Sequence, residues 1–270
     1  MALPLLSRLR SHEYVALLLG LIFIIFEGAL HIIIVSLLPK LVINWFYHKS
    51  RSLFLYFVGA NSAKPEARRL ADRIRKANDF EDLCAIFGYH NVEEHVVLTK
   101  DGYLLGIHRI PGPKGEPRPI PGTSTGKPVV YLHHGLLMNS EVWVCVTNPE
   151  RSVPFVLAEL GYDVWLGNNR GNKYSKKSIH HDPNSSKFWN FSIDDFAWHD
   201  IPDSIEYILQ ITRASSLSYV GFSQGTAQAF AALSIHPQLN QKVNVFVALA
   251  PAMRPRGLSA PIVDGLMKAS

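Results

Sequence analysis

Tyr219–Val220–Gly221–Phe222–Ser223–Gln224–Gly225 combines a short apolar strand with the pattern G-x-S-x-G, and Thr226–Ala227–Gln228–Ala229–Phe230 follows it as the start of a helix. A strand that turns sharply into a helix at a serine is typical of a nucleophile elbow. Gly221 and Gly225 lack side chains, which leaves room for so tight a turn. We therefore predict that Ser223 presents its hydroxyl above the edge of a sheet, as a catalytic nucleophile.

The sequence around this stretch alternates apolar strands with helices. A hairpin with Asp-Gly in its turn is expected first, from Val92–Thr99 and Tyr103–Ile110. The predicted later strands are Val129–His133, Asp163–Leu166, Ser218–Val220 and Val243–Ala250. The predicted helices between them are Val153–Leu160, Ile201–Ile211 and Thr226–Ile235. This alternation predicts an α/β fold with a mostly parallel sheet flanked by helices.

An earlier strand end supplies a second element of the predicted site. Tyr131–Leu132–His133–His134–Gly135–Leu136–Leu137 places His-Gly where a flexible loop can aim backbone N–H groups at a developing oxyanion. We predict an oxyanion hole made of the backbone amides of Leu136 and Gln224, the residue after the serine. His133 and His134 are interpreted as structural, because the base of such a site does not come from this part of the chain.

The ordered motifs resemble the acid lipases of the α/β-hydrolase superfamily, and most closely the membrane-anchored steryl ester hydrolases of fungi. The resemblance runs from about Phe80 to the C-terminus. Its stretches are Cys84–Tyr89, Val96–Leu105, His134–Leu137, Gly167–Asn172, Phe188–Ser192 and Gly221–Thr226. It implies hydrolysis of a neutral lipid, a steryl ester or an acylglycerol (triacylglycerol), through an acyl-enzyme on Ser223 at membranes or lipid droplets.

The residues after the serine depart from the family pattern. In this fold the triad acid and histidine follow the nucleophile along the chain, yet only 47 of the 270 residues follow Ser223. They contain one predicted strand, one histidine (His236) and one late carboxylate (Asp264), and we assign neither side chain to a triad. We therefore expect a C-terminally truncated lipase with little activity, since a missing triad member costs about 10⁴- to 10⁶-fold in turnover. The alternatives are a non-catalytic anchored protein and a serine-dependent acyltransferase.

The N-terminal part is strongly apolar. Tyr14–Leu38 carries a single formal charge, Glu27, and as a helix would exceed the ~30 Å hydrocarbon core. It predicts a membrane anchor that either spans the bilayer or forms a hairpin in one leaflet, and a cleaved signal peptide is the weaker alternative. Residues 1–60 are interpreted as anchor and interfacial segment, 61–80 as a charged linker, 81–250 as a partial hydrolase domain and 251–270 as the start of a cap. A lipid droplet or the endoplasmic reticulum is the expected location.

Composition limits the remaining possibilities. The net charge of +5 is not accompanied by a basic-aromatic module, so no nucleic-acid partner is expected. Cys84 and Cys145 are interpreted as buried small residues rather than a disulfide. Acidic residues near His199 (Asp194, Asp195, Asp200) are interpreted as a helix start rather than a metal site, and no cofactor motif is present. The glycosylation sequons Asn184–Ser186 and Asn190–Ser192 matter only for a lumenal domain.

Overall fold

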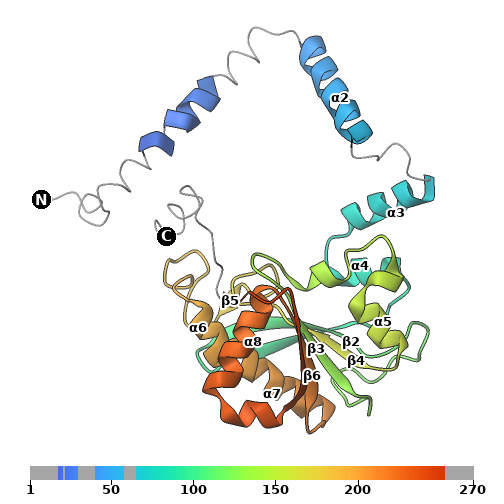
Figure 1. Ribbon diagram of the computed structural model, residues 1–270, viewed down its shortest axis with the longest axis vertical. Helices are drawn as coiled ribbons and strands as arrows, with labels where there is room; N and C mark the ends of the chain where they lie inside the picture. The colour runs from blue at the N-terminus through green and yellow to red at the C-terminus, as the bar shows by residue number, and fades with distance from the viewer. Residues whose placement is uncertain (1–17, 21, 30–39, 58–64, 253–270) are drawn as a thin grey trace, which may run out of the picture. The chain divides into compact units, whose positions relative to one another are not determined.

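The computed structural model describes residues 18–20, 22–29, 40–57 and 65–252 (Figure 1). The chain divides into two compact units, one of residues 1–65 with 255–270 and one of residues 66–254. Each unit is described by itself below.

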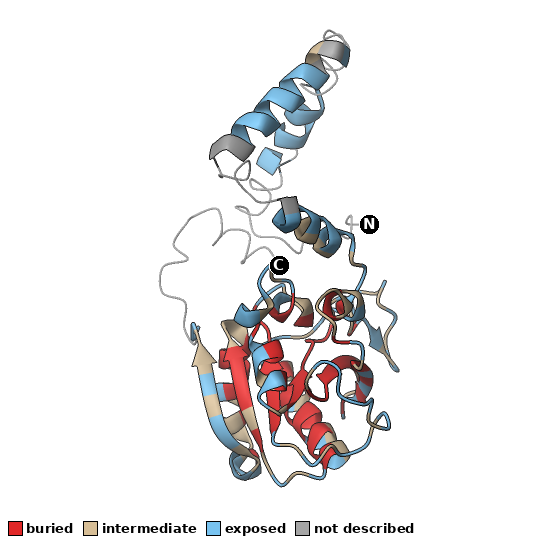
Figure 2. Ribbon diagram, turned by 90° about the vertical axis from the view of Figure 1, so that its right-hand side faces the viewer, coloured by how far each residue is buried: buried red, intermediate tan, exposed pale blue. Residues whose placement is uncertain are grey.

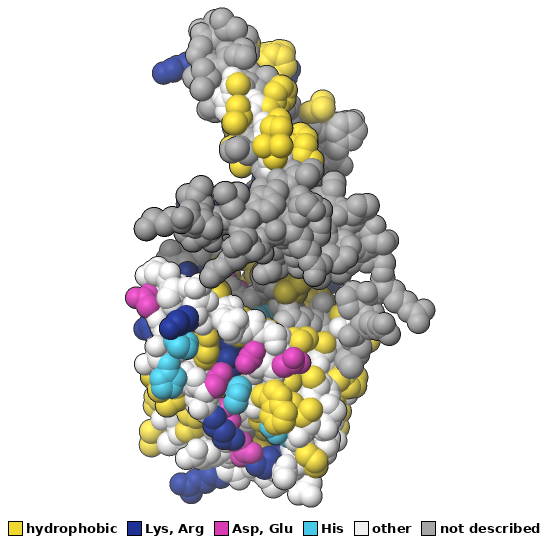
Figure 3. Space-filling model, turned by 90° about the vertical axis from the view of Figure 1, so that its left-hand side faces the viewer, with side chains coloured by type: hydrophobic (Ala, Val, Ile, Leu, Met, Phe, Trp, Pro, Cys, Tyr) yellow, Lys and Arg dark blue, Asp and Glu magenta, His cyan; other side chains and the backbone are white. Residues whose placement is uncertain are grey.

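The N-terminal unit is helical where it is described. Residues 18–20 and 22–29 are helical, and α2 covers Lys40–Phe57. Their large side chains are exposed, with Phe23 at 70% and Phe54 at 65%. Figure 3 shows these hydrophobic side chains in yellow along the helices. Among the described helices, none is both long and apolar enough to cross a membrane.

The predicted anchor falls partly outside the described residues. Of Tyr14–Leu38, residues 14–17, 21 and 30–38 are not described. The anchor therefore stays a prediction, as do its orientation and its alternative geometries. The predicted start of a cap, residues 251–270, is described only at 251 and 252.

The second unit is built on a seven-stranded sheet with the order β1-β2-β4-β3-β6-β7, and β5 pairs with β2. The strands β4, β3, β6 and β7 run parallel, whereas β1, β2 and β5 pair antiparallel. The strands are β1 Glu93–Leu98, β2 Tyr103–Ile110, β3 Val129–His133, β4 Asp163–Leu166, β5 Lys177–Ser178, β6 Leu217–Phe222 and β7 Val243–Leu249. The mostly parallel sheet predicted from the sequence is confirmed.

Helices cover both faces of this sheet (Figures 1 and 2). The α-helices are α3 Pro65–Lys76, α4 Phe80–Ile86, α5 Val153–Glu159, α6 Ile193–Asp195, α7 Ile201–Thr212 and α8 Gln224–Ile235. Short 3₁₀ turns form η2 Ser140–Trp143, η3 Pro149–Arg151 and η5 Pro237–Gln241, and η4 Phe196–Asp200 is a π-helical turn that joins α6 to α7. Ser192 and Asp195 form a capping box at α6, which confirms the predicted helix start there.

The central strands are buried on both faces, which explains their continuous apolar sequence. Successive side chains of a strand point to opposite faces, so Val129 and Tyr131 pack in one hydrophobic cluster and Val130 and Leu132 in the other. The first cluster includes the inner faces of α7 and α8, and the second those of α4 and α5. Two packed layers thus hold the carboxyl ends of β3 and β6 side by side.

The prediction that both cysteines are buried and unbridged is correct for Cys84 and only partly correct for Cys145. Cys84 is buried in α4, where burial raises the pKa of its thiol, with Glu81 and Asp79 adding to the effect. Cys145 is exposed, and both thiols are free. The prediction that Cys145 is buried is wrong, because its segment follows η2 at the surface rather than entering the sheet.

Candidate active site

Ser223 occupies the bend between β6 and α8. Its backbone has φ 50° and ψ −115°, a left-handed φ that is unfavourable for a residue with a side chain. Its amide donates to the carbonyl of Leu249 at 2.9 Å, and its own carbonyl accepts from the amide of Thr226 at 2.9 Å. The chain therefore turns at Ser223 as predicted, and the side chain is half-buried rather than enclosed.

Glycines make this bend possible by allowing three segments of backbone to meet. A Cβ on Gly221 would lie 2.9 Å from the carbonyl carbon and oxygen of Gly225. One on Gly225 would lie 2.6 Å from the carbonyl oxygen of His133 and 2.7 Å from that of His134. No side chain fits at such distances against backbone. The G-x-S-x-G spacing is thus required by the packing of α8 against the end of β3.

The two predicted oxyanion-hole residues line one cavity. Leu136 and Gln224 both contribute to a hollow of about 490 Å³. Gly135 brings the loop close to the serine, since a Cβ there would lie 3.1 Å from Cβ of Ser223. Within the part of the chain that the structure describes, the amide N–H groups of Leu136 and Gln224 donate no hydrogen bond. Neither N–H therefore has a protein acceptor there, as an oxyanion hole requires, and their role as its donors stays a prediction.

The walls of this cavity are largely apolar. Seven hydrophobic side chains come from the loop after β3 and from the segment before α7: Leu136, Leu137, Met138, Trp189, Phe191, Ile193 and Phe196. Leu137 is 98% exposed and has φ 57°, so the turn displays a leucine fully to solvent. A polar edge with free amides beside an apolar wall suits an ester that carries a hydrocarbon chain.

The hydroxyl of Ser223 has no hydrogen-bond partner among the described side chains, which belong to residues 18–20, 22–29, 40–57 and 65–252. His236 ends α8, about 18 Å along a helix of twelve residues from the serine. Its ring contacts Trp198 at 5.1 Å between centroids. Asp264 lies outside the described residues. That His236 and Asp264 do not belong to a catalytic triad stays a prediction.

His133 and His134 are buried at the end of β3. Burial lowers the pKa of His133 well below its usual value, and the neighbouring His134 lowers it further. Burial also lowers the pKa of His134 to about 4, although its hydrogen bond to the carbonyl of Gly135 opposes the shift. Both rings are therefore neutral at pH 7, in keeping with the interpretation that they are structural.

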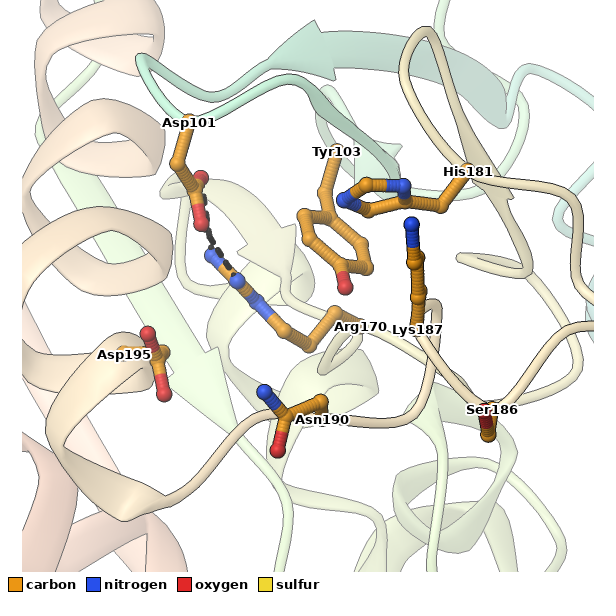
Figure 4. A pocket seen from close by; sticks show the side chains of 8 residues that line it. All are labelled: Asp101, Tyr103, Arg170, His181, Ser186, Lys187, Asn190 and Asp195. Atoms are coloured by element: carbon orange, nitrogen blue, oxygen red, sulfur yellow. Dashed lines mark hydrogen bonds and ion pairs between the residues drawn. The ribbon is translucent and has the colours of Figure 1, made fainter.

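A second cavity of about 680 Å³ lies beside the first and is predominantly polar (Figure 4). Arg170 lines both cavities. Ser186 and His181 both line this hollow (Figure 4), and among the described residues no hydrogen bond joins them as a nucleophile and base. The polar cavity offers no catalytic pair, and the candidate site stays at Ser223.

Arg170 is buried between two carboxylates. It donates to Asp200 at 2.6 and 2.9 Å and to Asp101 at 2.5 and 3.0 Å, and its guanidinium lies 4.1 Å from the ring centre of Tyr103. Burial by itself lowers the pKa of Arg170, but the two carboxylates outweigh it and raise that pKa. Asp200 is the N-cap residue of α7, as the interpretation of a helix start expects, but its side chain makes no capping hydrogen bond and pairs with this arginine instead. Among the described residues, no group of three potential ligands could hold a metal ion.

The segment Gly167–Asn172 is one of the stretches that carry the family resemblance, but the sequence alone indicates no role for its members. The structure gives Arg170 a structural role and brings Asn169 and Asn172 against His134. The signal that could have indicated a loop at the site is the position of this segment. Three polar residues, 168–170, lie between Gly167 and Gly171 directly after the buried strand β4.

A parallel sheet, a serine at a strained strand-to-helix bend and two free amides beside it together define the α/β-hydrolase class. In agreement, a family model described as "alpha/beta hydrolase fold" matches residues 128–262, and one described as "Partial alpha/beta-hydrolase lipase region" matches residues 80–147. The chain belongs to the lipase family of α/β-hydrolases.

Its relatives carry lipase names. A Schizosaccharomyces pombe protein described as a probable lipase is 48% identical over 99% of this chain and 57% of its own length. Human lipase member K is 41% identical over 78% of this chain and 49% of its own length. Rat gastric triacylglycerol lipase is 44% identical over 68% of this chain and 45% of its own length. The chain spans about half the length of the curated relatives that it matches.

Proposed function

We propose that this protein hydrolyses carboxylic esters of lipids through an acyl-enzyme on Ser223. The observation that carries the proposal is the left-handed bend at Ser223 with the free amides of Leu136 and Gln224 beside it. In the first step the serine oxygen bonds to the ester carbonyl carbon, and the carbonyl oxygen gains the negative charge. Each amide that donates to this oxygen typically contributes about 3 kcal/mol to the transition state.

The reaction then divides into two halves. The tetrahedral intermediate breaks its bond to the alcohol, which leaves with a proton, and the acyl group stays on the serine. Water attacks this acyl-enzyme in the second half and releases the fatty acid. A general base has to take the proton of the Ser223 hydroxyl, and the expected histidine and acid follow the nucleophile in this fold. We assign that base to no described residue.

The proposed substrate is a neutral lipid, either a steryl ester or an acylglycerol. The apolar walls of the cavity that Leu136 and Gln224 share support a long acyl chain over a short polar one. The name of the rat relative, a triacylglycerol lipase, is compatible with an acylglycerol. The resemblance to steryl ester hydrolases favours the steryl ester. Assays of the purified chain with cholesteryl oleate and triolein side by side distinguish the two.

A membrane or lipid-droplet surface is the proposed place of action. Helix α2 exposes aromatic and aliphatic side chains that water solvates poorly, including Trp45, Phe46 and Phe54. Helix α3 packs Ile74 against the second cluster and carries Arg73, Arg75 and Lys76 in its last turn. Apolar and basic side chains of this kind favour binding to a lipid surface with anionic headgroups.

The test of the serine mechanism is covalent labelling with a fluorophosphonate. We expect the full chain to be labelled at Ser223, as located by peptide mass spectrometry, and the Ser223→Ala variant to remain unlabelled. The labelling is expected to be slow, because no described residue is assigned as the base of the serine. Ser234→Ala is the matched control, because Ser234 is an exposed serine on the same helix that bonds the carbonyl of Ala231. Equal labelling of wild type and Ser223→Ala, or no labelling of either, would contradict the proposed mechanism for this chain.

A further inference from the structure

His134 lies between the oxyanion-hole loop and the loop after β4. Its Nδ1 is 2.8 Å from the carbonyl oxygen of Gly135, and its Nε2 is 3.2 Å from the backbone nitrogen of Asn169. The side-chain nitrogen of Asn172 also lies 3.2 Å from Nε2. The ring itself is 1% exposed. Water therefore does not substitute for these partners.

The two backbone partners determine the tautomer. A backbone N–H can only donate, so Nε2 must accept from Asn169 and carries no proton. A backbone carbonyl can only accept, so Nδ1 carries the proton and donates to Gly135. A second proton on the ring would lie on Nε2 and face the N–H of Asn169, so the hydrogen bond between these two nitrogens would be lost. The low pKa of His134, about 4 through burial, agrees with a neutral ring.

The bond from His134 is the shorter of two hydrogen bonds that hold the peptide between Gly135 and Leu136. The carbonyl of Gly135 and the N–H of Leu136 belong to one planar trans unit, so they point in opposite directions. Gly135 lacks a Cβ, and Leu137 next to this unit already has a left-handed φ of 57°. The amide of Met138 also donates to the Gly135 carbonyl, at a longer 3.3 Å. Rotation of the peptide would break both bonds and change the direction of the Leu136 N–H.

We propose that His134 is a positioning residue that, through its Nδ1–H bond to Gly135, holds the Leu136 N–H in the orientation needed to stabilise the oxyanion. This inference rests on the proposed function and adds a role for a residue that sequence reasoning treats as structural. Through Nε2 the same ring ties the oxyanion-hole loop to Asn169 and Asn172, which line the same cavity. His134 touches no substrate and acts through the peptide.

Two variants separate the two ends of the ring. In His134→Asn the side-chain NH₂ lies near the position of Nδ1 and can still donate to Gly135. In His134→Gln the amide reaches the position of Nε2 and leaves the Gly135 carbonyl without its side-chain donor. Loss of one oxyanion-hole donor typically lowers kcat about 10²- to 10³-fold. We expect a fall of this size in the Ser223 labelling rate and in kcat for His134→Gln, with KM within about threefold, and a loss under about tenfold for His134→Asn.

The control is His133→Asn, a buried histidine in the adjacent position that makes no bond to Gly135. Thermal unfolding of each variant separates a loss of rate from a loss of folded protein. A His134→Gln protein that is folded and labels as fast as wild type overturns the inference while the proposed function stands. The same conclusion follows if His134→Asn and His134→Gln lose rate equally.

A spectroscopic measurement tests the inference even where labelling fails. In the full chain labelled with ¹⁵N-histidine and ¹⁵N-leucine, we expect His134 to have a protonated Nδ1 and an unprotonated Nε2 at pH 7. The amide resonance of Leu136 should shift in His134→Gln and stay close to wild type in His134→Asn. A ring protonated at Nε2 in the folded protein contradicts the proposed bond, whatever the enzymatic activity.

Discussion

His108, His133 and His134 are three buried histidines whose neutral form the fold requires. Burial lowers the pKa of His108 to about 3 and that of His134 to about 4, and it lowers the pKa of His133 well below its usual value. Each ring packs against other aromatic rings, and His108 stacks on Phe80 with 4.2 Å between centroids. Together they link the stability of the domain to pH.

The sign of this dependence follows from proton binding. Between the unfolded histidine pKa of ~6.5 and the lower folded values, the unfolded chain binds protons that the folded chain excludes. Stability is therefore complete above pH 6.5 and falls as the pH drops, by about 2 kcal/mol each for His108 and His134 at pH 5. We expect the free energy of unfolding, measured by urea titration, to fall steeply between pH 7 and pH 5.

The variant His108→Asn should reduce the slope of the unfolding free energy against pH. The reduction is at most the effect of one bound proton, about 1.4 kcal/mol per pH unit. His90→Gln is the matched control for the replacement of a histidine, because His90 is exposed. A slope that is identical in His108→Asn and wild type would show that this ring is not held neutral by the fold.

At the scale of elements, the position of α8 depends on its contact with the end of β3. Gly225 lies in the first turn of the helix, and a Cβ there would meet backbone oxygens of two residues at under 3 Å. The hydroxyl of Tyr219 also donates to the carbonyl of Gly225 at 3.0 Å. The contacts of Gly225 with the end of β3 and with Tyr219 of β6 thus fix the bend at Ser223, and helix propensity does not.

The Gly225→Ala variant should therefore force α8 away from β3. We expect a loss of at least about 2 kcal/mol in unfolding free energy, since overpacking against backbone cannot be relieved by a rotamer change. Ala231→Gly, on the half-buried side of the same helix, controls for the general effect of a substitution there and should cost about 1 kcal/mol. Equal stability of Gly225→Ala and wild type would mean that the helix can shift freely.

Longer segments also depend on distant partners. The Pro-rich connector between β2 and β3 is mostly exposed, as the sequence predicts, but its last part is pinned to the domain. Arg109 donates to the carbonyl of Thr123, and Thr125 donates to Asp163 at 2.9 Å. Arg109 and Asp163 themselves form a fully buried ion pair at 2.6 Å. This ion pair joins the end of β2 to the start of β4.

For the whole molecule, the proposed lipid surface gives a prediction about binding. Replacement of Trp45, Phe46 and Phe54 by serine removes three exposed aromatic rings from α2. We expect recovery of the full chain with floated phosphatidylcholine vesicles to fall at least tenfold in partition coefficient, about 1.4 kcal/mol, because buried apolar area drives such binding. Addition of phosphatidylserine should raise the recovery of wild type through the basic turn of α3.

Ser52→Ala on α2 is the matched control and should float like wild type. Unchanged recovery of the triple serine variant would exclude α2 as a lipid-binding element. The comparison in 0.5 M salt separates the two forces, since salt screens the basic side chains and leaves the aromatic contribution in place.

Strands and helices were predicted correctly where the local pattern of apolar residues is enough to locate them. Val129–His133 and Asp163–Leu166 are strands with the predicted bounds, and α5, α7 and α8 differ from prediction by one or two residues at an end. These segments are buried on the faces that their apolar residues define, so periodicity is enough to locate them. The bend at Ser223 was predictable for the same reason, because glycine spacing is a local requirement.

Other features depend on residues that meet only in the folded chain. Asp101 and Arg170 are 69 positions apart, and His134 and Asn169 are 35 apart. Neither pairing leaves a periodic signal, since each partner also fits an exposed loop when it is considered alone. The sequence by itself determined the order of strands and helices and the place of the serine, because both follow from neighbouring residues. The buried ion pair of Arg170 and the hydrogen bonds of the Gly135–Leu136 peptide were decided by tertiary packing, because desolvation and hydrogen-bond direction depend on which loops the sheet brings together.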